Sequence, residues 1–132
     1  MGEKNMMDRY IYFNTRDTFF RVQLKQIVYF AADKNYTILQ LNCGRKLIFT
    51  FSLQKMEEYL RSNLKDDAAM FARIGKSHII NLHCVFQIDI VRQKLKLVDR
   101  EHQKEFIIEL SKESLKNLRN LFINTTMTTV IN

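Results

Sequence analysis

The sequence predicts a mainly β domain of antiparallel strands with two α-helices, at about residues 53–64 and 112–123. Three observations support this. Short aromatic and β-branched runs alternate with polar turns, and the apolar period becomes helical in only two places. The 132 residues include no proline and three glycines, which leaves no linker for a second domain. We therefore expect one domain at 10–123 between an N-terminal tail (1–9) and a flexible C-terminal tail (124–132).

The first half of the chain contains five strand-like runs. Polar stretches separate the first four, and the Asn-Cys-Gly-Arg sequence at 42–45 predicts a hairpin turn between the fourth and the fifth, because Asn and Gly tolerate positive φ. Ser52 then precedes a helical stripe and is a suitable N-cap. The expected strands lie at 10–13, 19–22, 27–30, 36–41 and 46–51.

The second half begins with the stretch FARIGKSHIIN at 71–81, in which apolar residues flank Gly75, Lys76 and Ser77. This pattern indicates a loop fixed at both ends, with the polar residues held outward. Residues 85–90 alternate like a half-buried strand, and runs around 95–97 and 106–108 supply two more. Ser111 is placed to cap the last helix, whose apolar stripe includes Leu115, Leu118 and Phe122.

The net charge of +7 favours a polyanionic partner. Many of the cations fall in expected loops and at element ends, which suits a protein that presents turns to a phosphate backbone and to base edges. These cations are Lys34, Arg45, Lys46, Arg73, Lys76, Arg92, Lys94, Lys96, Arg100 and Lys112.

No motif supports catalysis. The glycines are too scattered for a phosphate-binding loop, and the histidines and cysteines have no metal-site spacing. Cys43 and Cys84 are expected to be reduced, buried thiols, and the acidic pairs at 57–58 and 66–67 to be solvated surface. With no apolar run long enough to span a membrane and no signal peptide, we expect a cytoplasmic protein that is no enzyme and has no cofactor, metal or membrane partner.

Taken in order, these segments resemble the LytTR domain of bacterial transcription regulators, from about residue 10 to 122. FARIGKSHIIN follows the family signature aromatic-x-Arg-apolar-x-basic-Ser-aromatic-apolar-apolar-Asn, with His78 at the second aromatic position. FSLQKMEEYL matches the family helix, and Leu110, Ser111 and Lys112 match the motif before the last helix. The resemblance implies an antiparallel fold without a recognition helix, in which loop residues enter successive major grooves.

Carried over position by position, the resemblance implies DNA contacts at three places. The first is Thr37, with Lys34 and Asn35 in the same polar turn, and the second is Lys76. The third is Lys112, where the family often has an arginine that can bind guanine through two hydrogen bonds. Arg73 and Ser77 are expected to contact phosphate or to shape the loop. The implied site is Lys34, Asn35, Thr37, Arg73, Lys76, Ser77 and Lys112.

The resemblance also implies a partner set: double-stranded DNA with paired repeat sites, a homodimer on DNA, and a receiver or sensor domain or a histidine kinase upstream. The chain is then either a stand-alone regulator or the output domain of a two-component response regulator. An alternative is a protein–protein interaction module that keeps the fold and has lost specific DNA reading, which Gly75 and Lys112 would favour. A third interpretation is nonspecific binding to anionic surfaces.

Overall fold

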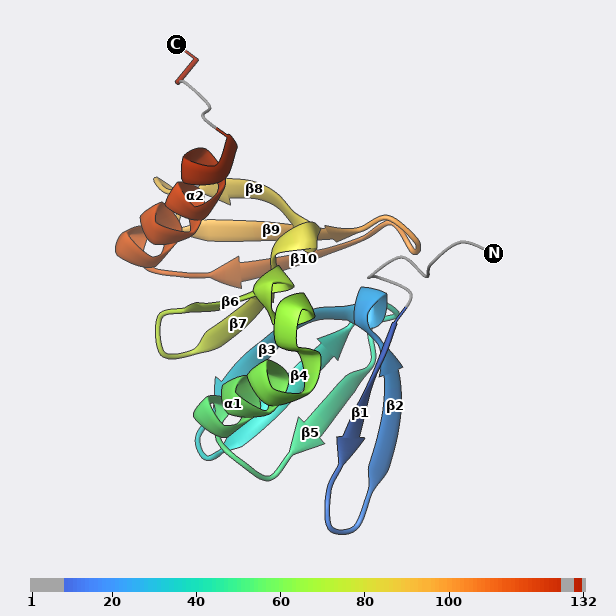
Figure 1. Cartoon of the computed structure of the whole chain (residues 1–132). Helices are drawn as coiled ribbons and strands as arrows, with labels where there is room; N and C mark the ends of the chain where they lie inside the picture. The colour runs from blue at the N-terminus through green and yellow to red at the C-terminus, as the bar shows by residue number, and fades with distance from the viewer. Residues whose placement is uncertain (1–8, 127–129, 132) are drawn as a thin grey trace.

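A five-stranded antiparallel sheet lies at the centre of the computed structural model, which describes residues 9–126 and 130–131. Its strand order is β5-β4-β3-β7-β6. The turn between β3 and β4 and the turn between β6 and β7 lie at the same edge of this sheet (Figure 1). The strands are β3 (Ile27–Asp33), β4 (Tyr36–Leu41), β5 (Lys46–Phe49), β6 (Phe71–Ile74) and β7 (His78–Asn81).

One face of this sheet is covered by the hairpin of β1 (Tyr10–Asn14) and β2 (Phe19–Gln23) and by helix α1 (Leu53–Leu64). The helix begins where the sequence predicted, because the Ser52 hydroxyl accepts a hydrogen bond from the Lys55 N–H at 3.2 Å. The buried side chains on this side are largely aromatic and aliphatic, and include Phe13, Phe30, Phe49, Met56 and Ile79.

The other face packs against a three-stranded sheet and the second helix. The strands are β8 (Val85–Asp89), β9 (Lys94–Asp99) and β10 (Lys104–Glu109), in the order β10-β9-β8, followed by α2 (Lys112–Thr126). Ser111 caps α2, since its hydroxyl accepts from the Ser114 N–H at 3.1 Å. Val28, Ile80, Leu95, Leu115 and Leu118 fill this second core. The predicted mainly antiparallel fold with two helices is confirmed.

The structure differs from the sequence prediction at several boundaries. Three 3₁₀ helices, Leu24–Gln26, Lys65–Met70 and Leu82–Cys84, were not expected. Helix α2 continues to Thr126, beyond the expected end at residue 123. At the other end, Arg9 is tied to the domain by an ion pair with Asp67 at 2.9 Å. The remaining parts of both expected tails, 1–8, 127–129 and 132, lie outside the described residues.

Most of the turns between strands lie at two opposite edges of the molecule, whereas the β1–β2 turn lies at the bottom of Figure 1. At the left of the figure lie the β3–β4 turn, the β6–β7 turn, the β8–β9 turn and the start of α2. We call this the loop edge, comprising residues 34–35, 75–77, 90–93 and 111–114. At the right lie the β4–β5 and β9–β10 turns. Among the described residues, no helix is long and apolar enough to cross a bilayer.

Candidate nucleic-acid interface

The β3–β4 turn presents two of the expected contact residues to solvent. Lys34 adopts a left-handed conformation (φ 56°), and Lys34 and Asn35 are both exposed. A positive φ is uncommon for lysine and fixes a tight reversal between the two strands. The side chains at this turn are therefore held out from the end of a rigid hairpin.

Thr37, the contact expected at the polar turn, is not at the surface. Its side chain is fully buried, and its hydroxyl donates to the Phe51 carbonyl at 2.8 Å. The hydroxyl thus connects β4 to the segment that leads into α1. Of the three contacts expected at this hairpin, only Lys34 and Asn35 have exposed side chains.

The β6–β7 turn is reversed at Gly75, whose φ of +61° suits glycine. Lys76 and Ser77 follow it and are exposed. Arg73 shapes this turn from inside: its Nη2 donates to the Lys76 carbonyl at 3.0 Å, and its Nη1 to Glu57 Oε1 at 3.0 Å. Because only 25% of the Arg73 side chain is exposed, it acts as a brace for the turn.

His78 occupies the position where the family signature has an aromatic residue, and it packs as one. Its ring centroid lies 6.0 Å from that of Tyr29, and its Nδ1 shares a hydrogen bond with the Ser77 hydroxyl at 2.8 Å. Burial lowers the pKa of the His78 ring, because removing the imidazolium from water is unfavourable. The hydrogen bond with the neutral ring holds the Ser77 hydroxyl in place at the turn.

A backbone hydrogen bond and a close approach at Gly75 show that the turns of the loop edge are neighbours. The Ala32 N–H donates to the Ser77 carbonyl at 2.8 Å, which places the β6–β7 turn beside the β3–β4 hairpin. On its other side, a Cβ added to Gly75 would lie 3.2 Å from Ser114 Oγ, so the first turn of α2 approaches the same loop. Lys112, at the helix start, is exposed.

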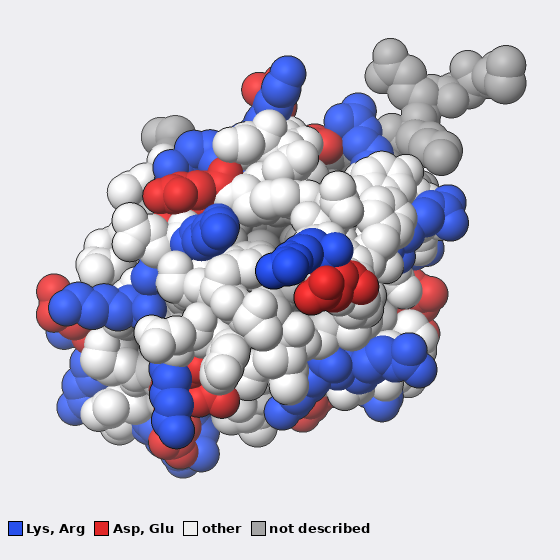
Figure 2. All heavy atoms as spheres, turned by 90° about the horizontal axis from the view of Figure 1, so that it is seen from below, with Lys and Arg blue, Asp and Glu red and all other residues white. Residues whose placement is uncertain are grey.

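Three lysines thus project from the loop edge: Lys34 from the β3–β4 turn, Lys76 from the β6–β7 turn and Lys112 from the start of α2. Each is exposed, and none forms an ion pair with another described residue. Figure 2 shows basic side chains interspersed with acidic ones over the face seen from below. Unpaired ammonium groups on fixed loops are suited to contact phosphate oxygens and base acceptors.

Comparison with known proteins identifies the family of this chain. The family described as the LytTr DNA-binding domain matches residues 17–123. The chain belongs to the LytTR family. It is a DNA-binding domain by this membership, and the expected family resemblance is confirmed.

A solved structure supports the LytTR fold independently. The LytTr DNA-binding domain of a putative methyl-accepting/DNA response regulator from Bacillus cereus matches with a TM-score of 0.56 at 20% sequence identity. The match covers 86% of this chain and 95% of that one. At this identity the likeness supports the fold alone. No curated protein matches the sequence.

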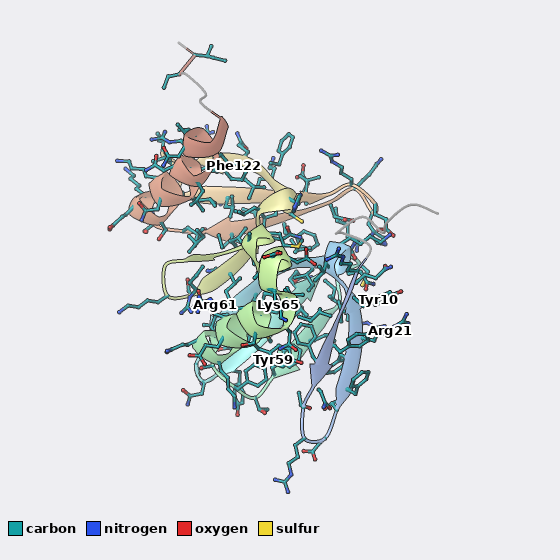
Figure 3. All side chains as sticks on the ribbon, viewed as in Figure 1. Tyr10, Arg21, Tyr59, Arg61, Lys65 and Phe122 are labelled. Carbon is teal, nitrogen blue, oxygen red and sulfur yellow. The ribbon has the colours of Figure 1, made fainter. Side chains whose placement is uncertain are left out.

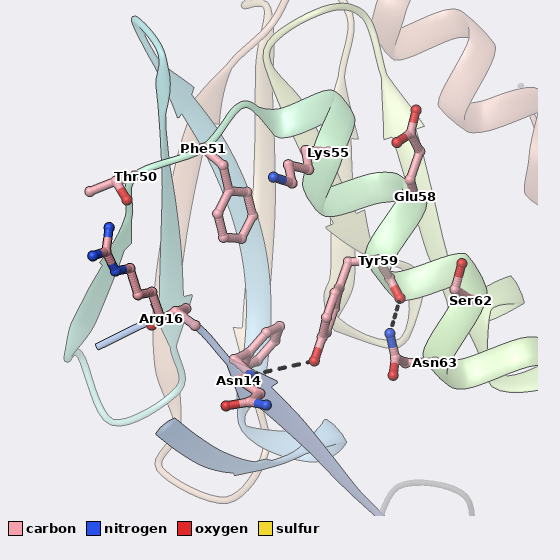
Figure 4. Close-up of a pocket in the computed structure, with 11 residues that line it drawn as sticks. Asn14, Arg16, Thr50, Phe51, Lys55, Glu58, Tyr59, Ser62 and Asn63 are labelled. Carbon is pink, nitrogen blue, oxygen red and sulfur yellow. Dashed lines mark hydrogen bonds between the residues drawn. The ribbon is translucent and has the colours of Figure 1, made fainter. Parts of the chain in front are cut away.

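A cavity of about 570 Å³ in this LytTR domain lies between α1, the β1–β2 hairpin and the segment after β5 (Figure 4). Its wall includes Phe51 and Tyr59, and Tyr59 lies on the underside of α1 (Figure 3). The Tyr59 hydroxyl bridges the β1 backbone, accepting from the Asn14 N–H and donating to the Tyr12 carbonyl. No group of three or more metal-binding side chains occurs among the described residues.

Several polar residues have roles that the sequence did not reveal. Glu57, expected to be solvated, is the anchor of Arg73, and Asp67 is buried beside Arg9. Cys43 is exposed, contrary to the expectation of a buried thiol, whereas Cys84 is buried as expected. The two ion pairs, Arg73–Glu57 and Arg9–Asp67, join residues that are distant in sequence, so no local pattern signals either contact.

Proposed function

We propose that this LytTR domain binds a specific double-stranded DNA sequence as the output domain of a bacterial transcription regulator. Lys34 with Asn35, Lys76 with Ser77, and Lys112 are the contact groups, and they read successive major grooves. The observation that carries the proposal is that separate segments of the chain bring unpaired, exposed lysines to one edge. Arg73 acts through the Lys76 turn and does not touch DNA.

The contact groups differ in the DNA atoms that they can bind. Ammonium groups fit phosphate oxygens as well as the O6 and N7 acceptors of guanine, whereas the Asn35 amide can pair with adenine. Lys112 supplies a compact point charge, so it discriminates guanine less strongly than an arginine would. We expect Lys76 to contribute the most to sequence reading, because its turn is fixed from both sides by Arg73 and Ala32.

The expected binding mode involves paired repeats. One loop edge spans a limited stretch of duplex, so two copies of the domain on neighbouring repeats would increase affinity and selectivity. A receiver or sensor domain, or a histidine kinase acting upstream, would control such binding. The structurally similar Bacillus cereus domain comes from a putative methyl-accepting/DNA response regulator, a class of protein in which such control is expected.

Selection from a random duplex pool, followed by quantitative binding, tests the proposal. We expect an enriched sequence and a log K that falls by about 3–6 units per decade of salt. Lys76→Ala should lose about 1–3 kcal/mol on the selected duplex and less on a scrambled one. Lys46→Ala is the matched control, because Lys46 is exposed and lies near the end of β4 opposite to Lys34.

Three outcomes would contradict the proposal. Absence of binding to any duplex at low salt would favour the alternative of a protein–protein interaction module. Equal loss on selected and scrambled DNA for Lys76→Ala would make Lys76 a phosphate anchor and would remove it from base reading. Equal affinity for all duplexes would indicate nonspecific binding by net charge.

A further inference from the structure

We propose that the β8–β9 turn is a further DNA-contacting loop, in which Arg92 binds a backbone phosphate next to the segment contacted by Lys112. The inference rests on the proposed DNA binding and deepens it. It assigns a role to a turn that the family resemblance did not mark as a contact. The ligand group is a phosphodiester oxygen pair, which carries no base identity.

The position of the turn is set by two backbone connections. The Leu110 N–H donates to the Gln93 carbonyl at 3.2 Å, which ties the approach to α2 directly to this turn. The strand register agrees, because Lys94 at the start of β9 is opposite Glu109 at the end of β10. Lys112 follows Leu110 by two positions, so the two cations emerge from adjoining parts of the loop edge.

The turn is already ordered in the free protein. Asp89 Oδ1 accepts from the Arg92 N–H at 3.0 Å, and the Gln93 N–H donates to the Ile90 carbonyl at 3.3 Å. Gln93 completes the reversal with a φ of 56°. A preformed turn loses little conformational freedom on binding, so a charge placed on it contributes more of its interaction to affinity.

The Arg92 guanidinium is available to a ligand. Its side chain is 80% exposed, and its one described partner is Asp89 Oδ2 at 3.3 Å. Ion pairs at such exposed positions contribute little, and a phosphate offers the same two-oxygen geometry with which a guanidinium pairs strongly. DNA can thus replace Asp89 as the partner of the side chain while Asp89 continues to hold the backbone of the turn.

The same small sheet provides a matched control. Arg100 lies in the β9–β10 turn, is exposed, and is at the opposite end of β9, away from the loop edge (Figure 1). Replacing Arg92 or Arg100 by alanine removes the same charge from the same sheet. A net-charge effect would therefore weaken binding equally in both variants, whereas a contact at the loop edge would not.

The test measures the affinity of the wild type, Arg92→Ala, Arg100→Ala and Lys76→Ala for a duplex selected from a random pool, over a range of salt concentrations. We expect Arg92→Ala to weaken binding about 3- to 10-fold and to reduce the salt slope by about 1, with equal loss on scrambled DNA. Arg100→Ala should stay within about twofold of the wild type. Arg92→Gln should weaken binding to the same extent as Arg92→Ala. Thermal unfolding of each variant is measured as the control for correct folding.

The outcomes separate the two proposals. Equal effects of Arg92→Ala and Arg100→Ala, alongside a clear loss for Lys76→Ala, would overturn the role of Arg92 and leave DNA binding intact. A folded wild type that binds no duplex would overturn both. A loss for Arg92→Ala confined to the selected sequence would replace the phosphate contact by a base contact.

Discussion

Arg73 holds the backbone of Lys76: its Nη2 donates to the Lys76 carbonyl at 3.0 Å, while its Nη1 is anchored by Glu57 of α1. A guanidinium can make both bonds at once because its donors have a fixed planar arrangement. The turn that presents Lys76 is therefore connected to the helix on the first face of the sheet. In the proposed binding mode, DNA affinity should depend on Arg73 through the turn that it holds.

We expect Arg73→Lys to weaken binding to a selected duplex about fivefold and to lower the free energy of unfolding by about 1 kcal/mol. Lysine keeps the charge but cannot bridge Glu57 and the Lys76 carbonyl together. Titration of the duplex and urea denaturation measure the two effects.

Arg61→Ala is the control for this prediction. Arg61 also pairs with Glu57, at 3.5 Å, but it is 71% exposed and does not reach the turn. Its loss should change stability by less than about 0.5 kcal/mol and leave DNA affinity unchanged. If both variants weakened binding equally, the brace between Arg73 and Lys76 would have no functional role.

Thr37 and Lys34 should behave in opposite ways. Thr37→Val leaves the Phe51 carbonyl without its donor, so the free energy of unfolding should fall by about 1 kcal/mol while DNA affinity stays constant. Lys34→Asn keeps a residue that tolerates positive φ and removes the charge, so affinity should fall and stability should not. A large loss of affinity for folded Thr37→Val would restore Thr37 as a contact.

The burial of Thr37 shows where sequence patterns reach their limit. Strand and helix positions followed from periodicity, and Ser52 and Ser111 were recognisable as caps because capping is local. Strand β4 lies inside a sheet covered on both faces, where neighbouring side chains are buried on either side. Alternation then no longer distinguishes inward from outward positions.

The parts of the site that could not be predicted depend on tertiary contacts. Gly75 and Lys76 were expected to project outward, because a glycine-containing turn between apolar pairs has few alternatives. The bond from Arg73 to Glu57 requires α1 to be packed beside β6, and the proximity of the β8–β9 turn to α2 requires the register of β9 and β10. Neither arrangement leaves a local signal in the sequence.

The two thiols should differ in reactivity. Burial, with a smaller contribution from the Asp99 charge, raises the pKa of Cys84 to about 12, so almost no thiolate forms at neutral pH. Cys43 is exposed in the β4–β5 turn. We expect a thiol reagent to modify one cysteine in the folded protein and both in denaturant, as counted by mass spectrometry. Rapid modification of Cys84 under native conditions would contradict its burial.

His78 should make stability depend on mildly acidic pH. Because its pKa in the folded protein is below the ordinary value of 6.5, the unfolded chain takes up a proton first as pH falls. The associated stability is fully present above about pH 6.5 and is lost as pH decreases toward the folded pKa. His78→Phe retains a ring against Tyr29 and removes this titration.

The comparison is made by urea denaturation of the wild type and His78→Phe between about pH 7.5 and about pH 5. The variant should gain stability relative to the wild type as pH falls, whatever its offset at neutral pH from the lost hydrogen bond with Ser77. The other ionisable groups are the same in both proteins, so their contributions cancel in the difference. Parallel pH profiles would show that His78 is no more protected from protonation in the folded protein than in the unfolded chain.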